Sequence, residues 1–162
     1  MPLPHHYRVT KYDPASWDES GVYTGDDWTM FSEIGEVFEG VRLTLATYLD
    51  VEAQHLVALA SFLEESGTAS VTAEGVENSG NAFRVSEGAE LSPLEAIEAV
   101  RQMLRDEGWC RLTDGDRLYI HVGRDYYIYV GTDSPCDRSV ELAQQSGLFI
   151  DRDFPSPYLS ED

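Results

Sequence analysis

Three short apolar segments separated by turn residues constrain the fold of this chain more than any other feature of its sequence. Residues 109–112, 117–122 and 126–130 are rich in β-branched and aromatic side chains, which favour extended strands. The connections between them are Thr-Asp-Gly-Asp at 113–116 and Gly-Arg-Asp at 123–125, and such short polar sequences are typical of hairpins. We therefore expect these segments to form an antiparallel meander.

The length of the second connection predicts which side chains of the meander share a face. Side chains alternate between the two faces of a strand, and a connection with an odd number of residues keeps the apolar positions of both strands on one side. These apolar positions are Leu118, Ile120, Val122, Tyr126, Ile128 and Val130. The opposite face, which we call the tyrosine-rich face, then carries Tyr119, His121, Tyr127 and Tyr129.

Helices are predicted before and after the meander. Residues 44–66 show the helical spacing of apolar side chains, and Thr44 is able to cap this helix. The sequence Ser-Pro-Leu-Glu at 92–95 is typical of a capping box, which starts a helix that is expected to reach Glu107 with Gly108 at its C-terminal cap. The other expected elements are a helix at 134–146, strands at 6–12 and 148–150, and a hairpin of 69–77 with 82–86 around a turn at 78–81.

This order of elements predicts an α+β fold in which a mainly antiparallel sheet of about seven short strands has three helices packed on one face. The chain has 162 residues, a length that fits a single globular domain over residues 1–162. Residues 15–40 are expected to form a long loop that packs on the core and covers the second face of the sheet. Residues 154–162 are expected to form a loose acidic tail.

The charge of the chain limits the classes of ligand that it can bind. It contains 30 acidic and 11 basic residues and has a formal net charge of −19. Nucleic-acid binding depends on many Lys and Arg side chains, so direct binding to nucleic acid or to an anionic membrane is disfavoured. One explanation of the negative charge is a repulsive surface that keeps the protein soluble, as in a protein adapted to high salt. The other is a docking face for a basic partner.

We interpret the chain as an acidic, cytoplasmic, non-enzymatic interaction protein that binds and masks a basic protein partner. An immunity protein that blocks a nuclease toxin and a protein that imitates nucleic acid are inhibitors of this type. Carboxylates attract such a partner and aromatic side chains hold it, with Trp28 and Tyr127 as the expected central anchors. The predicted partner-binding residues are Asp26, Asp27, Trp28, Glu33, Glu36, Tyr119, His121, Tyr127 and Tyr129.

The alternative is a small enzyme or ligand-binding protein that uses the tyrosine-rich face. Phenols and an imidazole side by side are able to stack on a planar ligand or to transfer protons, although cross-strand packing also explains such a face. Cys136 is expected at the second position of the third helix, where the helix dipole lowers the pKa of a thiol and favours a nucleophile. A cysteine enzyme would also need His55 or His121 nearby.

No pattern in the sequence assembles a full set of metal ligands or a cofactor motif. The acidic pairs at 26–27 and 114–116 hold too few carboxylates for a calcium loop, so neither a metal nor a cofactor is expected. A cytoplasmic location is expected because no apolar run is long enough to span a membrane and the chain does not start like a secretory signal. Residues 7–14, YRVTKYDP, with 27–29, DWT, resemble the start of small bacterial proteins, a resemblance that implies no particular activity or site residue.

Overall fold

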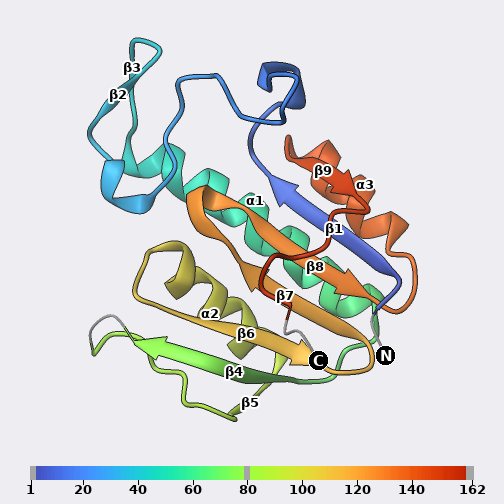
Figure 1. Ribbon diagram of the computed structural model, residues 1–162. Coiled ribbons are helices and arrows are strands. Elements are labelled where there is room, and N and C mark those ends of the chain that lie inside the picture. The colour runs from blue at the N-terminus through green and yellow to red at the C-terminus, as the bar shows by residue number, and fades with distance from the viewer. Residues whose placement is uncertain (1–2, 79–80, 160–162) are drawn as a thin grey trace.

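The computed structural model describes residues 3–78 and 81–159 and has the α+β architecture that the sequence predicts (Figure 1). In this part of the chain, seven strands form one antiparallel sheet in the order β5-β4-β6-β7-β8-β1-β9. A separate small hairpin pairs β2 with β3. The strands are β1 (His5–Thr10), β2 (Val37–Phe38), β3 (Val41–Arg42), β4 (Val71–Asn78), β5 (Glu90–Leu91), β6 (Gly108–Asp114), β7 (Leu118–Val122), β8 (Ile128–Thr132) and β9 (Phe149–Arg152).

Three helices cover one face of the large sheet, which we call the inner face (Figure 1). The first helix begins after Thr44, whose hydroxyl accepts a hydrogen bond from the backbone N–H of Thr47. The second begins with a capping box between Ser92 and Glu95. Both helix starts are confirmed as predicted. The helices are α1 (Leu45–Glu65), α2 (Pro93–Leu104) and α3 (Asp137–Gln145).

The inner face is apolar, and its side chains pack with the helices in one cluster. In the pairing of β7 with β8, Ile120 lies opposite Val130 and Val122 lies opposite Ile128, which confirms the predicted alternation. These side chains are buried together with Phe62 of α1. Removal of this apolar surface from water is the main driving force that holds helices and sheet together.

Two predicted helix boundaries and one predicted cap are wrong. α2 ends at Leu104 rather than Glu107, because the chain turns at Asp106, where φ is 61°. Gly108 does not cap this helix but opens β6, and a Cβ atom there would collide with the ring of Phe83. α3 begins at Asp137, so residues 134–136 precede the helix.

The predicted hairpin after α1 is confirmed only in its first strand. Residues 82–86 form no strand, and β4 pairs instead with β5 further along the chain. The carboxylate of Glu87 accepts hydrogen bonds from the backbone N–H groups of Gly75 and Val76 at 3.1 and 3.0 Å. A side chain therefore takes the backbone donors that a second strand would have used. Of the predicted turn at 78–81, residues 79–80 lie outside the described part of the chain.

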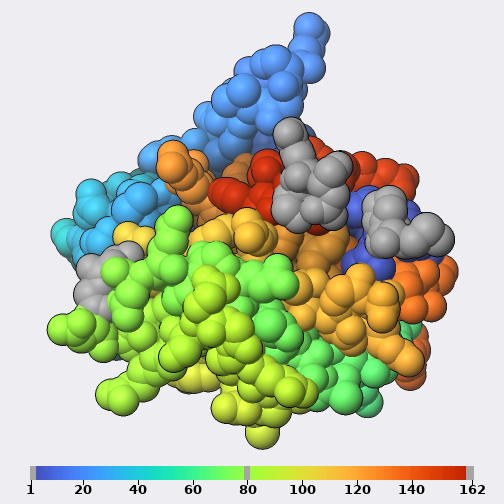
Figure 2. Space-filling model, turned by 60° about the horizontal axis from the view of Figure 1, so that its bottom comes forward, coloured from blue at the N-terminus to red at the C-terminus, as the bar shows by residue number. Residues whose placement is uncertain are grey.

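The segment between β1 and α1 is irregular but packs on the core at several points, as expected. We call residues 13–41 the acidic loop; it contains short 3-10 turns, β2 and the first residue of β3. The β2–β3 hairpin stands away from the large sheet in Figure 1. Trp28 is its deepest anchor, with its ring against those of Tyr48 and Tyr126. Figure 2 shows the first part of the loop, in blue, projecting from the body of the molecule.

The second face of the sheet, the outer face, is covered mainly by residues 153–159, which we call the C-terminal segment. The backbone N–H of Asp153 donates to the carbonyl of His6 in β1 at 2.8 Å. Further along, the ring of Phe154 stacks on Tyr129 of β8. The expectation of a loose tail is therefore wrong for residues 154–159, while residues 160–162 lie outside the described part. Residues 15–40, which were expected to cover this face, reach it at Trp17, which lies against Arg8, and at Tyr23, which lies against Tyr12.

Candidate partner-binding surface

A row of polar and aromatic side chains crosses the outer face of the sheet. Arg111, His121, Tyr129, Arg8 and Asp151 are successive neighbours in the pairings of β6, β7, β8, β1 and β9. At the end of the row, Nε of Arg8 donates to Asp151 at 2.8 Å. The structure thus brings His121 and Tyr129 side by side, as the alternation of the meander predicts.

The C-terminal segment shields this row from solvent. The hydroxyl of Ser156 lies 2.7 Å from Nδ1 of His121, and its backbone N–H donates to the hydroxyl of Tyr119 at 3.2 Å. With Phe154 stacked on Tyr129, the side chains of Tyr119, His121 and Tyr129 expose only 4%, 2% and 8% of their surface. These three predicted partner-binding residues are closed to a partner while the segment is in place.

Tyr127, the fourth residue of the predicted tyrosine-rich face, is half-buried beside the row. Its ring lies 5.3 Å from the ring of Tyr12, and the guanidinium of Arg8 lies 4.8 Å from its ring centre. Burial raises the pKa of Tyr127. These contacts give Tyr127 a packing role and leave it less accessible than a central interface anchor would be.

His121 and Ser156 combine a base with a hydroxyl, but the pair is closed to a substrate. Ser156 is buried, and its oxygen also accepts a hydrogen bond from the backbone N–H of Tyr158 at 3.0 Å. Burial, assisted by the positive charge of Arg111, lowers the pKa of His121 to about 4. The imidazole is therefore neutral and weakly basic at neutral pH, which suits a structural hydrogen bond better than proton transfer.

The structure does not support a nucleophile at Cys136. This residue is the N-cap of α3 rather than its second helical residue, and its side chain is fully buried in the apolar cluster with Val140 and Ala143. Burial raises the pKa of the Cys136 thiol to about 11. The thiol stays protonated at neutral pH, because burial outweighs any effect of the helix dipole.

Arg8 is enclosed by aromatic rings where the acidic loop and the C-terminal segment meet the sheet. Its guanidinium lies 4.7 Å from the ring centre of Trp17 in the loop, 4.8 Å from Tyr127, and 3.9 Å from Phe154 in the segment. A cation over several ring faces is attracted by each of them. Arg8 thus fastens two irregular segments to β1.

A second buried cation fixes the middle of the acidic loop. Nζ of Lys11 lies 4.0 Å from the ring centre of Trp28 and 2.7 Å from a carboxylate oxygen of Asp27. Burial lowers the pKa of Lys11 to about 8, although Asp27 acts in the opposite direction. Trp28 is buried and Asp27 is paired. These two predicted partner-binding residues therefore hold the loop on the body of the protein.

The other predicted carboxylates remain at the surface of the acidic loop. Asp26 accepts a hydrogen bond from the backbone N–H of Glu39 at 2.7 Å. Glu33 accepts two from Thr29, from its backbone N–H and its hydroxyl, both at 2.9 Å. Glu36 is exposed. Because these donors are uncharged, they fix the positions of the carboxylates without neutralising them.

Acidic side chains greatly outnumber basic ones in and next to the acidic loop. Residues 13–41 contain eight Asp and Glu residues and no Lys or Arg. The adjacent cations are Arg42, which ends β3, and Lys11, which pairs with Asp27. Apolar side chains are exposed among them, since Met30 and Val37 expose 46% and 52% of their surface and Val41 exposes 70%. The loop therefore combines fixed negative charge with accessible apolar area, the two components from which interfaces with charged proteins are built.

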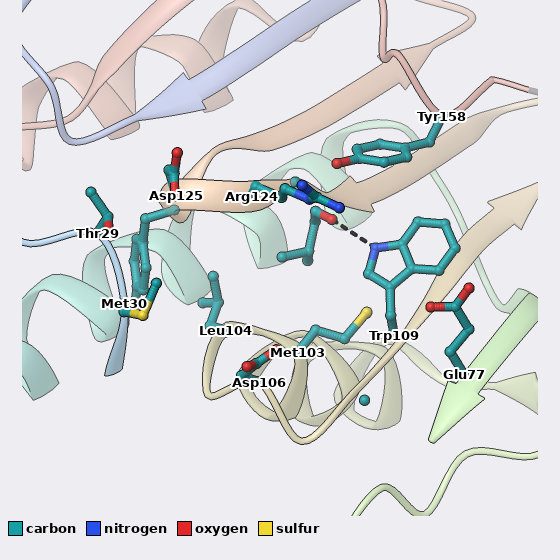
Figure 3. A pocket seen from close by; sticks show the side chains of 14 residues that line it. Thr29, Met30, Glu77, Met103, Leu104, Asp106, Trp109, Arg124, Asp125 and Tyr158 are labelled. Atoms are coloured by element: carbon teal, nitrogen blue, oxygen red, sulfur yellow. Dashed lines mark hydrogen bonds between the residues drawn. The ribbon is translucent and has the colours of Figure 1, made fainter. Parts of the chain in front are cut away.

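A pocket of about 520 Å³ opens between the acidic loop and the C-terminal segment (Figure 3). Its lining comes from five separate stretches of chain, at 29–30, 77, 103–109, 122–126 and 158. The sequence did not predict this pocket, because no local pattern connects stretches so far apart. Charged, aromatic and apolar side chains line it, among them Met30, Glu77, Met103, Leu104, Asp106, Trp109, Arg124, Asp125 and Tyr158.

Within 3–78 and 81–159, no group of three or more His, Cys, Asp and Glu side chains is placed to hold a metal ion. None of the helices formed by these residues combines the length and the apolar character of a membrane span.

Comparison with known proteins found no family model, no curated protein and no solved structure that matches this chain. Since a fold alone does not define an activity, the function has to be argued from the surface and pocket just described.

Proposed function

We propose that this protein is a cytoplasmic inhibitor that binds a basic protein through the acidic loop and masks the positive surface of that partner. The observation that carries the proposal is the excess of negative charge over residues 13–41, which contain eight carboxylates and no Lys or Arg; one of the eight, Asp27, is paired with Lys11. Asp26 and Glu33 are held in position there by uncharged donors. Fixed charge of one sign speeds encounter with an oppositely charged partner.

A nuclease or another nucleic-acid-binding protein has the surface that such a loop complements. Phosphate-binding sites are lined by Lys and Arg side chains, and an inhibitor of the immunity-protein or nucleic-acid-mimic type places carboxylates where the phosphates would lie. The exposed Val37 and Val41 of the β2–β3 hairpin add apolar contact area next to these charges. Such contacts exclude water and so strengthen charge pairs at an interface.

The test compares two triple variants with the same change of net charge. The loop variant carries Asp26→Asn, Glu33→Gln and Glu36→Gln. The partner is captured from the native cell lysate at low salt, identified, and purified. Association of the partner with the wild-type chain and with each variant is then measured in a surface-binding assay at increasing salt concentration.

The matched control neutralises three exposed carboxylates outside the loop, with Glu64→Gln, Asp116→Asn and Asp133→Asn. We expect the loop variant to associate about tenfold more slowly and with a weaker dependence on salt, and the control to stay within about twofold of wild type. Equal association rates for the two variants, or a rate that salt does not change, would overturn the proposal. The acidic residues would then serve only to keep the protein soluble.

A further inference from the structure

The pocket between the acidic loop and the C-terminal segment has a rigid aromatic wall. The indole N–H of Trp109 donates to the carbonyl of Val122 at 2.8 Å, which fixes the plane of the ring. The ring of Tyr158 lies 5.3 Å from that of Trp109, with 56° between the planes. Figure 3 shows both rings on one side of the pocket, with the sulfur of Met103 directed toward the indole. This wall offers ring faces and polarisable surface to a ligand.

Three carboxylates belong to the lining of the pocket, Glu77 beside the aromatic wall and Asp106 and Asp125 on the other side. Glu77 is opposite Trp109 in the pairing of β4 with β6, and Figure 3 shows its carboxylate beside the indole. Asp106 contributes from the turn after α2 and Asp125 from the connection between β7 and β8. Within the described part of the chain, none of these three carboxylates takes part in an ion pair. Their charges are available to a ligand.

We propose that this pocket receives one arginine side chain of the basic partner. The inference rests on the proposed function and deepens it, because it assigns a specific subsite next to the acidic loop. A guanidinium is planar and is able to stack on an indole while it donates two parallel hydrogen bonds to a carboxylate such as Glu77. Met30 and Leu104, which also line the pocket, provide apolar surface for the aliphatic part of the side chain.

Other ligand classes fit the pocket less well. An anion would meet three unpaired carboxylates against one guanidinium, that of Arg124, in a chain of net charge −19. A purely apolar ligand would remove water from these charges without replacing its hydrogen bonds. A lysine ammonium carries one compact charge with strong hydration and lacks the flat surface that stacks on a ring. Arginine therefore matches both components of the lining.

Arg124 allows a second test, in which removal of a side chain is expected to strengthen binding rather than weaken it. Its side chain lines the same pocket, and Figure 3 shows the guanidinium extending toward Trp109 and Tyr158. Arg124 forms no ion pair within the described residues. An incoming cation is repelled by Arg124 and competes with it for the same surface, so removal of this side chain is expected to strengthen binding.

The test uses the full chain, labelled with ¹⁵N, and N-acetyl-arginine amide as the probe. The cross-peak of the Trp109 indole N–H is assigned by its loss in Trp109→Phe and followed during titration. We expect saturable shifts with the arginine probe, weaker shifts with N-acetyl-lysine amide, and none with N-acetyl-citrulline amide, which has a similar shape but no charge. Shifts of equal size with the citrulline probe would overturn the proposal.

Variants then test the charges of the pocket individually. We expect Glu77→Gln and Asp106→Asn each to weaken binding of the arginine probe about threefold, and Arg124→Ala to strengthen it about twofold. The control is Glu74→Gln, an exposed carboxylate of the same strand that does not line the pocket, and it should leave affinity unchanged. Equal affinity in all four variants would overturn the inference.

The probe experiment and the partner experiment fail independently. If the arginine probe does not bind while the loop variant still slows association with the partner, the subsite is wrong and the masking function stands. If the probe binds as described while the loop variant associates at the wild-type rate, the pocket is a guanidinium site and the masking function is wrong.

Discussion

The two faces of the sheet are covered by different kinds of structure. Helices lie on the inner face, and their apolar side chains form one continuous buried cluster with residues such as Ile120 and Val130. The irregular C-terminal segment lies on the outer face, where cation–ring contacts of Arg8 and a hydrogen bond between Ser156 and His121 hold it. Both coverings bury the sheet, but through different interactions.

The two coverings therefore differ in how much they contribute to stability and in how easily they open. Apolar burial is distributed over many side chains and responds to volume. The outer covering depends on a few polar contacts, and regions with few apolar contacts open at lower free energy than the core. The proposed arginine pocket lies at the margin of this outer covering, since Tyr158 belongs both to the C-terminal segment and to the pocket.

The largest effect is expected on the inner face. Ile120 is fully buried, so Ile120→Ala should lower the free energy of unfolding by about 2–5 kcal/mol through lost burial and the cavity left behind. Thr113 of β6 is half-buried on the outer face, and Thr113→Ala should lower it by less than about 1 kcal/mol. Urea denaturation measures both values. Similar losses for the two variants would show that the faces contribute in the same way.

Gly131 tests whether the outer face is also tightly packed. It lies opposite Tyr119 in the pairing of β7 with β8, and a Cβ atom there would collide with the tyrosine ring. Gly131→Ala should therefore lower the free energy of unfolding by about 2 kcal/mol. Gly115, around which no atom lies within 4 Å of a built Cβ, is the control, and Gly115→Ala should change stability by less than about 0.5 kcal/mol. Equal urea midpoints for the two variants would contradict the close packing of Tyr119.

The inner face could be predicted from the sequence, whereas the outer covering could not. The alternation of Leu118, Ile120 and Val122 follows from the geometry of any strand, so a local pattern was sufficient to place them under the helices. The same alternation also placed His121 and Tyr129 together on the opposite face. Thr44 and the capping box at 92–95 predicted helix starts for the same reason, since each bond joins residues close in sequence.

Contacts between residues that are far apart in the chain leave no comparable pattern in the sequence. Arg8 and Asp151 are 143 positions apart, and nothing in the sequence of the C-terminal segment indicates that it lies over a tyrosine-rich sheet. The contact of Trp28 with Lys11 was not predicted, because a tryptophan in an acidic loop fits an interface anchor and a core anchor equally well and no sequence pattern joins positions 11 and 28. The alternation that places Trp109 beside Arg111 on the outer face was the only available signal for the pocket.

Arg8 tests the cation–ring contacts that hold the outer covering. Arg8→Met keeps an unbranched apolar side chain but removes the charge shared by three rings and Asp151. We expect a loss of about 1–2 kcal/mol in the free energy of unfolding and faster proteolysis near Phe154. The control is Arg152→Met, since its pair with Asp137 is exposed, with 53% and 74% of the side chains accessible, and should contribute less than about 0.5 kcal/mol. Losses of equal size in the two variants would remove the special role of Arg8.

The last prediction uses one buried histidine on each face. His55 of α1 lies in the core with Nε2 lacking a hydrogen-bond partner among the described residues, while His121 lies under the C-terminal segment. Burial lowers the pKa of both side chains to about 4 from an ordinary value of 6.5. Between these values the unfolded chain binds protons that the folded chain does not, so the stability is complete above the ordinary pKa and falls as the pH drops toward the lower one.

At about pH 5.5, each histidine should therefore reduce the free energy of unfolding by about 1 kcal/mol relative to about pH 7. Urea midpoints at the two pH values measure the loss in wild type, His55→Leu and His121→Asn, and each variant should remove its own share of the pH dependence. If only His55→Leu does so, His121 takes up its proton without global unfolding. That result would mean that the C-terminal segment opens in the folded protein, and it would sharpen the contrast between a core that unfolds as a unit and a covering that detaches alone.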